Sequence, residues 1–180
     1  MPDKKNINLI NCLLSFGVSD FSLKVLDEIP MEKLLEFSLL KSEPKVAFRA
    51  SWALEHILLK NPTYFDALYK VLILNYQEIR NWSALRSYTK LITFIVGNKN
   101  YVVNAKQHEI IVEKTFGLLE QKECPIAVKV NCFDILYHLI EKYPWIKNEL
   151  ILIIQFNLEK QNSPALNSRG NYLLKRIFNS

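Results

Sequence analysis

The chain has 180 residues, of which 49% are of hydrophobic types and 23% are charged. These fractions match ordinary globular proteins and exclude a disordered chain, and the length excludes two large domains. The 4 glycines leave too little turn chemistry for a many-stranded barrel, a sandwich or a glycine-rich phosphate loop. The formal net charge of +5 permits an acidic partner without requiring one.

Cysteine usage and the start of the chain bear on metal chemistry and location. Cys12, Cys124 and Cys132 include no close pair, so they offer neither a disulfide framework nor a four-ligand zinc site. The first residues lack the apolar core and cleavage site of a secretory signal, and the longest purely apolar run, 150–154, is far shorter than a membrane span. We therefore expect a soluble cytoplasmic protein with no cofactor and no metal.

Apolar residues recur three and four positions apart along almost the whole chain, which predicts helices throughout and no sheet. The first stretch, 6–29, is expected to form a degenerate helical pair that caps the N-terminus. Further antiparallel pairs should follow it, separated by short breaks rich in proline and asparagine. Their expected bounds are 31–60, 63–97, 104–142 and 145–178. The predicted fold is an all-α right-handed α-solenoid of four to five helix pairs, in a single domain over 1–180.

Prolines mark an internal repeat. Pro44, Pro125 and Pro164 each open a predicted helix, and they are separated by two repeats and then by one repeat of about 40 residues. The missing member of the series is expected near Ser83. A period near 40 residues with two helices in each repeat is typical of HEAT-type solenoids.

The stretch 32–54 resembles a HEAT repeat most clearly. It reads as an outer helix, a short turn with Pro44, and an inner helix that opens with small apolar residues and Arg49. The chain as a whole resembles a family of short bacterial HEAT-like proteins, on the stretches 49–55, 107–108, 126–129, 145–150 and 173–177. Members of that family are often labelled adenylosuccinate lyase. True adenylosuccinate lyases carry a flexible loop rich in glycine and serine, and because nothing in this chain matches that loop, we expect no lyase activity.

A polar stripe on the inner helices is the candidate binding surface. Lys45, Arg49, Trp52 and His56 are spaced by four, three and four positions, so they share one helix face. The opposite face is apolar, and Ala50 on it is expected to meet a neighbouring helix. Because inner helices line the concave side of a solenoid, matching positions of later repeats should continue the stripe. The concave-face candidates are Lys45, Arg49, Trp52, His56, Arg86, Lys90, Asp134, His138, Arg169, Tyr172 and Arg176.

Three interpretations of this stripe are open. The leading hypothesis is a non-enzymatic scaffold that binds a protein or peptide partner in the concave groove. The alternative is a weak nucleic-acid or phosphate-backbone surface, since the basic side chains are interleaved with Trp52 and Tyr172. The third is that the arginine near the start of each inner helix is a structural residue of its repeat. HEAT-like DNA glycosylases use tryptophans and one aspartate on such a face, but Trp52 and Asp134 lie two repeats apart and no local motif supports base excision.

The histidines are not expected to form a metal or catalytic site. His56 and His138 fall at equivalent positions two repeats apart, and neighbouring helices pack at about 10 Å, which predicts a separation of about 20 Å. His108 belongs to an outer helix.

Residues 98–104 are expected to be an ordinary connection, with an exposed binding loop as the alternative. Trp145 is expected to pack at the first turn of its own helix, in the manner of a hydrophobic staple.

Overall fold

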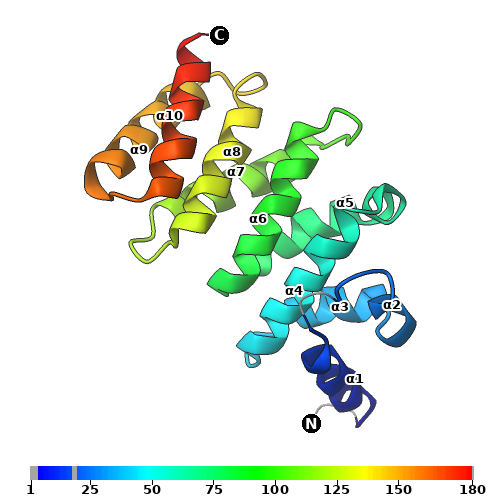
Figure 1. The fold of residues 1–180 in the computed structure, drawn as a ribbon. Helices are drawn as coiled ribbons and strands as arrows, with labels where there is room; N and C mark the ends of the chain where they lie inside the picture. Colours follow the sequence, from blue (N-terminus) through cyan, green and yellow to red (C-terminus); the bar gives the residue numbers. More distant parts are fainter. Residues whose placement is uncertain (1–3, 18–19, 180) are drawn as a thin grey trace. The chain divides into compact units, whose positions relative to one another are not determined.

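A computed structural model describes residues 4–17 and 20–179 of the chain. Over these ranges the secondary structure is helical without a strand, as the periodicity predicts (Figure 1). The helices are α1 (Lys4–Ser15), α2 (Val25–Glu28), α3 (Met31–Ser38), α4 (Pro44–Leu58), α5 (Pro62–Glu78), α6 (Trp82–Gly97), α7 (Ala105–Leu119), α8 (Ile126–Leu139), α9 (Ile146–Lys160) and α10 (Pro164–Phe178). No helix of the described ranges is long and apolar enough to cross a membrane.

The chain forms two compact parts, Met1–Leu91 and Ile92–Ser180, with the boundary inside α6. We refer to them as the N-terminal part and the C-terminal part, and each has its own core. The expected single domain with its repeat bounds stays a prediction, as does the right-handed sense of the solenoid.

Prolines begin several of the helices. Pro44, Pro62 and Pro164 are the first residues of α4, α5 and α10, and Pro125 directly precedes α8. Proline fits these positions because the first amides of a helix have no partner within the helix and its fixed φ suits the first turn. The proline series lacks a member near Ser83, where the sequence analysis expects a helix to begin. Helix α6 begins at Trp82, one residue before that position.

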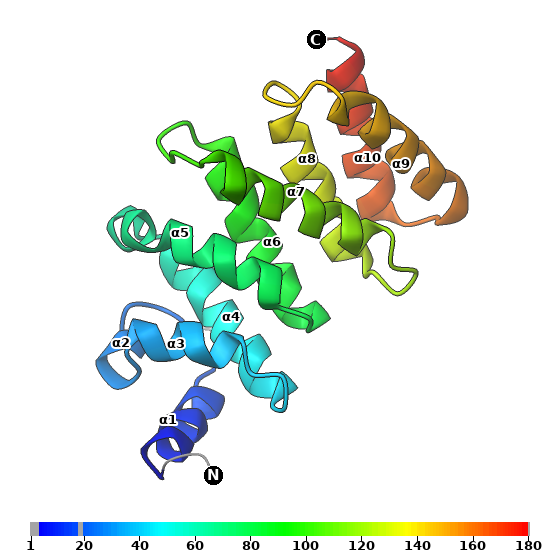
Figure 2. The ribbon, with the colours of Figure 1, turned by 180° about the vertical axis from the view of Figure 1, so that it is seen from behind.

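In the N-terminal part, α3 and α5 lie on one side while α4 and α6 lie on the other (Figures 1 and 2). Helix α4 packs against α1, α3 and α5. Its apolar face is completely enclosed, since Val46, Ala50, Leu54 and Ile57 are at most 1% exposed. The apolar face predicted from the spacing of these residues is therefore confirmed.

A buried polar network joins three helices of this part. The hydroxyl of Tyr88 in α6 shares a hydrogen bond of 2.8 Å with Ser38 Oγ at the end of α3, and it accepts one of 3.3 Å from Asn75 Nδ2 in α5. Burial raises the pKa of Tyr88, and the two hydrogen bonds oppose this shift. The network satisfies a phenol that would otherwise be costly to bury.

In the C-terminal part, α7 and α9 lie on one side and α8 and α10 on the other (Figure 2). Helix α8 packs against α7, α9 and α10, so most of its surface is enclosed. Phe133 and Leu136 of α8 are fully buried. Helices α9 and α10 approach closely at Gly170, where a Cβ atom would lie 3.1 Å from Cγ2 of Ile154.

Two connections bear on the expectations from sequence. In the connection before α7, Tyr101 packs against Phe94 with their rings 5.9 Å apart, whereas Val102 is 76% exposed. Trp145 directly precedes α9 and remains 54% exposed. Its ring stacks on Phe116 of α7 at 5.7 Å, so the aromatic partner of Trp145 comes from the preceding outer helix and not from its own first turn.

Candidate functional site

The stripe candidates divide between the two parts of the molecule. Helices α4 and α6 of the N-terminal part carry the α4/α6 cluster, which consists of Lys45, Arg49, Trp52, His56, Arg86 and Lys90. Helices α8 and α10 of the C-terminal part carry the α8/α10 cluster, which consists of Asp134, His138, Arg169, Tyr172 and Arg176. Each cluster has its own contacts.

In the α4/α6 cluster, Arg49 binds the segment that follows α1. Its Nη2 donates a hydrogen bond to the carbonyl oxygen of Phe16. Its guanidinium carbon lies 4.9 Å from the ring centroid of Phe21 and 5.9 Å from that of Trp52, within the range of cation–π attraction. These contacts are what a structural arginine makes, and they occupy much of the group that a ligand would use.

Trp52 belongs to an aromatic group in the same cluster. Its ring stacks on Phe48 at 5.5 Å, meets Phe21 edge-on at 5.3 Å and lies 5.5 Å from the ring of His56. Phe21 is only 3% exposed and lies between α1 and α2, in a segment that is not α-helical although the sequence analysis includes it in a helical pair. The half-buried Trp52 therefore holds the chain together locally rather than standing free on the surface.

The two cations of α6 in this cluster differ in their surroundings. Lys90 Nζ lies 2.5 Å from Glu55 Oε1, and Glu55 is 7% exposed, so the pair joins α6 to α4. Arg86 is exposed, as is Lys45 at the start of α4. One cation of the predicted stripe is thus neutralised by a carboxylate that the sequence analysis did not place beside it.

In the α8/α10 cluster, Arg169 joins α10 to α8. Its Nε donates to Oδ1 of Asp134 at 2.6 Å, and its guanidinium carbon lies 4.8 Å from the ring centroid of Tyr172. The Asp134 side chain is only 13% exposed. Burial raises the pKa of Asp134, and the hydrogen bond and charge of Arg169 lower it by less, so the net direction is upward.

Arg176 has a different environment in the same cluster. Its Nη1 donates to the hydroxyl of Tyr172 at 2.9 Å. Its guanidinium carbon lies 5.4 Å from the ring centroid of Tyr137 and 5.7 Å from that of Tyr172. Arg176 is exposed, and Tyr172 is 44% exposed. The result is a solvent-facing guanidinium held by two phenol rings, one on α8 and one on α10.

His138 borders this group on α8. Its ring lies 5.8 Å from that of Tyr137, and a Cβ atom at Gly97 would lie 3.1 Å from the imidazole. Although the residue is exposed overall, the ring is shielded on the side of Gly97. Burial is the main cause that lowers the pKa of His138; the charges of Arg169 and Arg176 add to it, and that of Asp134 opposes it. The imidazole is therefore neutral over more of the physiological range than an ordinary histidine.

The other histidines have separate surroundings. The His56 ring lies 6.3 Å from that of Phe21 in the N-terminal part. His108 is 7% exposed on α7, with Nδ1 lying 3.1 Å both from the Asn104 carbonyl oxygen and from Lys142 Nζ. Within the described ranges, no three His, Cys, Asp or Glu side chains come together in a way that could hold a metal ion.

The comparisons with known proteins agree with this architecture. The family model for the HEAT repeat domain matches residues 23–177, which is most of the chain. The chain belongs to the HEAT repeat family. No curated protein and no solved structure matches it. The resemblance seen in the proline spacing and in the pairing of helices is thereby confirmed for this HEAT-repeat protein.

Two residues of this HEAT-repeat protein are candidate binding residues that the sequence analysis did not include. Tyr137 contacts Arg176 on the α8/α10 cluster, and its signal was its position three residues after Asp134 on the same helix. Lys129 is buried in the first turns of α8, where the signal was a single lysine inside an apolar run. HEAT repeats generally mediate protein interactions. Exposed residues of the types that form interaction hot spots are therefore the main candidates for a binding site.

Proposed function

We propose that this HEAT-repeat protein is a non-enzymatic interaction module that binds a protein partner through the α8/α10 cluster, on the helix face expected to be concave. The observation that supports this most is Arg176, which is exposed and held by Tyr137 and Tyr172. Arginine and tyrosine are among the side chains that contribute most to binding at protein interfaces. A guanidinium already ordered by its neighbours loses less entropy on binding.

The α4/α6 cluster is less suited to this role. Arg49 already donates to the carbonyl of Phe16, Trp52 is packed among other rings, and Lys90 is paired with Glu55. A partner would have to replace these contacts before it gained new ones. We therefore place the main binding contacts on α8 and α10 and give Arg49 and Trp52 a structural role.

Affinity capture with matched variants tests the proposal. The immobilised wild-type protein, Arg176→Glu and Tyr172→Ala would be incubated with a lysate of the cells that produce the protein, and the captured proteins compared quantitatively. Lys175→Glu is the control, since it makes the same charge change on the neighbouring exposed residue of α10. We expect a specific partner that Lys175→Glu retains and that both other variants lose. Equal recovery of every partner by all four proteins would remove the α8/α10 cluster from the account of function.

A further inference from the structure

The outer helices of the C-terminal part enclose a groove that the predicted stripe does not include. Its volume is about 990 Å³, and it lies between α7 and α9 and reaches the first turns of α8. Its apolar wall consists of Phe116, Leu119, Leu152, Ile153 and Phe156. We call it the α7/α9 groove. It includes none of the residues of the α8/α10 cluster, so it goes beyond the surface of the proposed function.

The apolar wall of this groove is open to solvent. Leu152 is 60% exposed and Phe156 is 54% exposed, and both lie on α9 one helical turn apart. Side chains of this kind on adjacent turns form a continuous apolar patch rather than scattered exposed residues. Polar groups line the same groove, including Gln121 and Gln155. An apolar wall with a polar border is the composition of a peptide-binding groove.

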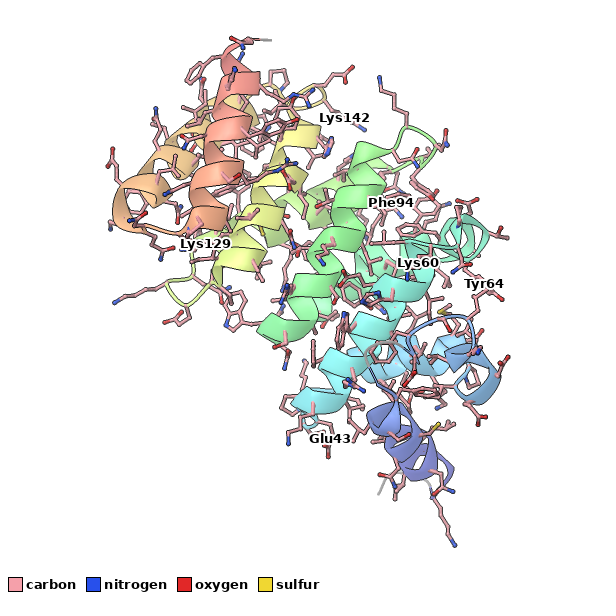
Figure 3. All side chains as sticks on the ribbon, in the orientation of Figure 1. Glu43, Lys60, Tyr64, Phe94, Lys129 and Lys142 are labelled. Carbon is pink, nitrogen blue, oxygen red and sulfur yellow. The ribbon has the colours of Figure 1, made fainter. Side chains whose placement is uncertain are left out.

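A buried ammonium group lines the groove. Lys129 is 6% exposed and lies at the beginning of α8 (Figure 3). Its Nζ donates to Oδ1 of Asn157 at 3.1 Å and to Oε1 of Gln161 at 3.2 Å. Both acceptors are neutral carboxamides, and within the described ranges no carboxylate forms an ion pair with Lys129. The position near the positive end of α8 adds to the electrostatic cost of this charge.

A buried cation without a counter-charge is unusual, because removing an ammonium from water is unfavourable unless an anion compensates the lost hydration. Two carboxamides satisfy hydrogen bonds but leave the net charge in place. The ammonium has a third N–H donor, for which the described residues provide no acceptor. A carboxylate brought by a ligand would supply both the missing acceptor and the missing charge.

The remaining charges around the groove decide which kind of anion suits it. Lys122 and Lys160 add two further cations to the lining, and Lys160 Nζ lies 4.1 Å from the ring centroid of Phe156. Three glutamates also line the groove, Glu120, Glu149 and Glu159. They balance the three lysines, so the lining offers no excess positive charge to a polyanion such as a phosphate backbone, whereas a single carboxylate can pair directly with the ammonium of Lys129. A single carboxylate next to an apolar group is the chemistry that this arrangement accepts.

We propose that the α7/α9 groove binds a peptide segment of a partner protein in which an aspartate or glutamate lies beside apolar side chains. The carboxylate pairs with Lys129, and the apolar side chains cover Leu152 and Phe156. The volume is at the upper end of the range of ligand pockets, about 300–1,000 Å³, so it accommodates several side chains rather than one ion. This site is independent of the α8/α10 cluster, and the two would bind different segments or different partners.

A titration with synthetic peptides tests this proposal on the full chain. The probes are acetyl-Leu-Asp-Phe-amide and its neutral match acetyl-Leu-Asn-Phe-amide, followed by methyl NMR of the wild-type protein. We expect the Asp peptide to shift the methyl signals of Leu119, Leu152 and Ile153 and to bind about tenfold more tightly than the Asn peptide. Equal binding of the two peptides, or binding of sodium acetate without any effect of the peptides, would overturn the proposal.

Two variants locate the effect. Lys129→Met retains the length of the side chain and removes the charge, so the preference for the Asp peptide should disappear. It also leaves Oδ1 of Asn157 and Oε1 of Gln161 without this donor, so circular dichroism is used to check that the variant folds. Phe156→Ala changes an exposed residue and should weaken both peptides by the same factor. Lys175→Met on α10 is the control and should change neither. A preference for Asp that survives Lys129→Met would show that the buried ammonium does not bind the carboxylate.

Discussion

Arg169 Nε donates to Asp134 Oδ1 at 2.6 Å, and this ion pair joins α10 to α8 in the C-terminal part. Replacing the arginine leaves a carboxylate that is only 13% exposed without its partner. We therefore expect Arg169→Met to lower the free energy of unfolding by about 1–3 kcal/mol at neutral pH. Urea denaturation followed by circular dichroism measures this change. Arg176→Met, on the same helix but fully exposed, is the control and should leave the midpoint nearly unchanged.

The same variant should respond to pH in a defined direction. Burial already raises the pKa of Asp134, and Arg169 opposes that shift, so removal of the arginine raises the pKa further. A carboxyl whose folded pKa exceeds its unfolded value stabilises the fold when protonated and destabilises it as pH rises through the folded pKa. The difference in the free energy of unfolding between the wild type and Arg169→Met should therefore become smaller in mild acid. A deficit that stays constant with pH would mean that the unpaired carboxylate is not its cause.

His108 should make the C-terminal part sensitive to acid. Burial is the main cause that lowers its pKa below 6.5; the charge of Lys142 adds to the shift, and the hydrogen bond with the Asn104 carbonyl opposes it. As the pH falls below about 6.5, His108 binds a proton in the unfolded chain before it does so in the folded protein. The free energy of unfolding is therefore highest above that pH and decreases below it. His138, whose pKa is also lowered, adds to the loss in the same window.

Lys142→Met separates the contribution of His108 from that of His138. Removing the ammonium that lies 3.1 Å from Nδ1 should bring the folded pKa of His108 closer to its ordinary value. The melting temperature of Lys142→Met should then decrease less steeply between neutral and mildly acidic pH than that of the wild type. The melting temperature of Lys175→Met should follow the wild type. Identical slopes in all three proteins would contradict the role given to the His108–Lys142 contact.

Local rules made much of the fold predictable, because they depend on neighbours in the sequence. The proline at a first helical turn is such a rule, and it placed the starts of α4 and α10 at Pro44 and Pro164. The contacts of the candidate site depend instead on which helices pack together. Asp134 and Arg169 were both recognised as stripe residues, yet nothing in either local sequence shows that their side chains pair. The burial of Lys129, which donates to Asn157 of α9, likewise cannot be read from the local sequence of α8.

Ala50 lies on the fully buried face of α4 and is 0% exposed. A leucine at this position needs space that the packed core does not have, so Ala50→Leu should overpack it and lower stability by about 1–3 kcal/mol. Ala67→Leu is the matched control, since it makes the same change on an exposed position of α5. Differential scanning calorimetry should show a lower melting temperature for the first variant and little change for the second. Equal melting temperatures would mean that the face carrying Ala50 tolerates a larger side chain.

We expect this protein to bind nucleic acid only weakly. The basic residues of the two clusters are Lys45, Arg49, Arg86, Lys90, Arg169 and Arg176. Lys90 and Arg169 are neutralised by Glu55 and Asp134, which leaves fewer cations to replace counterions on a phosphate backbone.

Fluorescence anisotropy with a labelled DNA duplex and a labelled single strand, at low and at physiological salt, measures this binding. We expect a Kd no better than about 10⁻⁴–10⁻⁶ M at physiological salt, without sequence preference. Because each neutralised phosphate contributes about 0.9 to the slope of log affinity against log salt, the slope should not exceed about four. Submicromolar binding that is lost in Arg176→Glu and retained in Lys175→Glu would assign the α8/α10 cluster to nucleic acid. Weak binding that is equal in these two variants would leave the cluster to a protein partner, since charge alone would then account for the affinity.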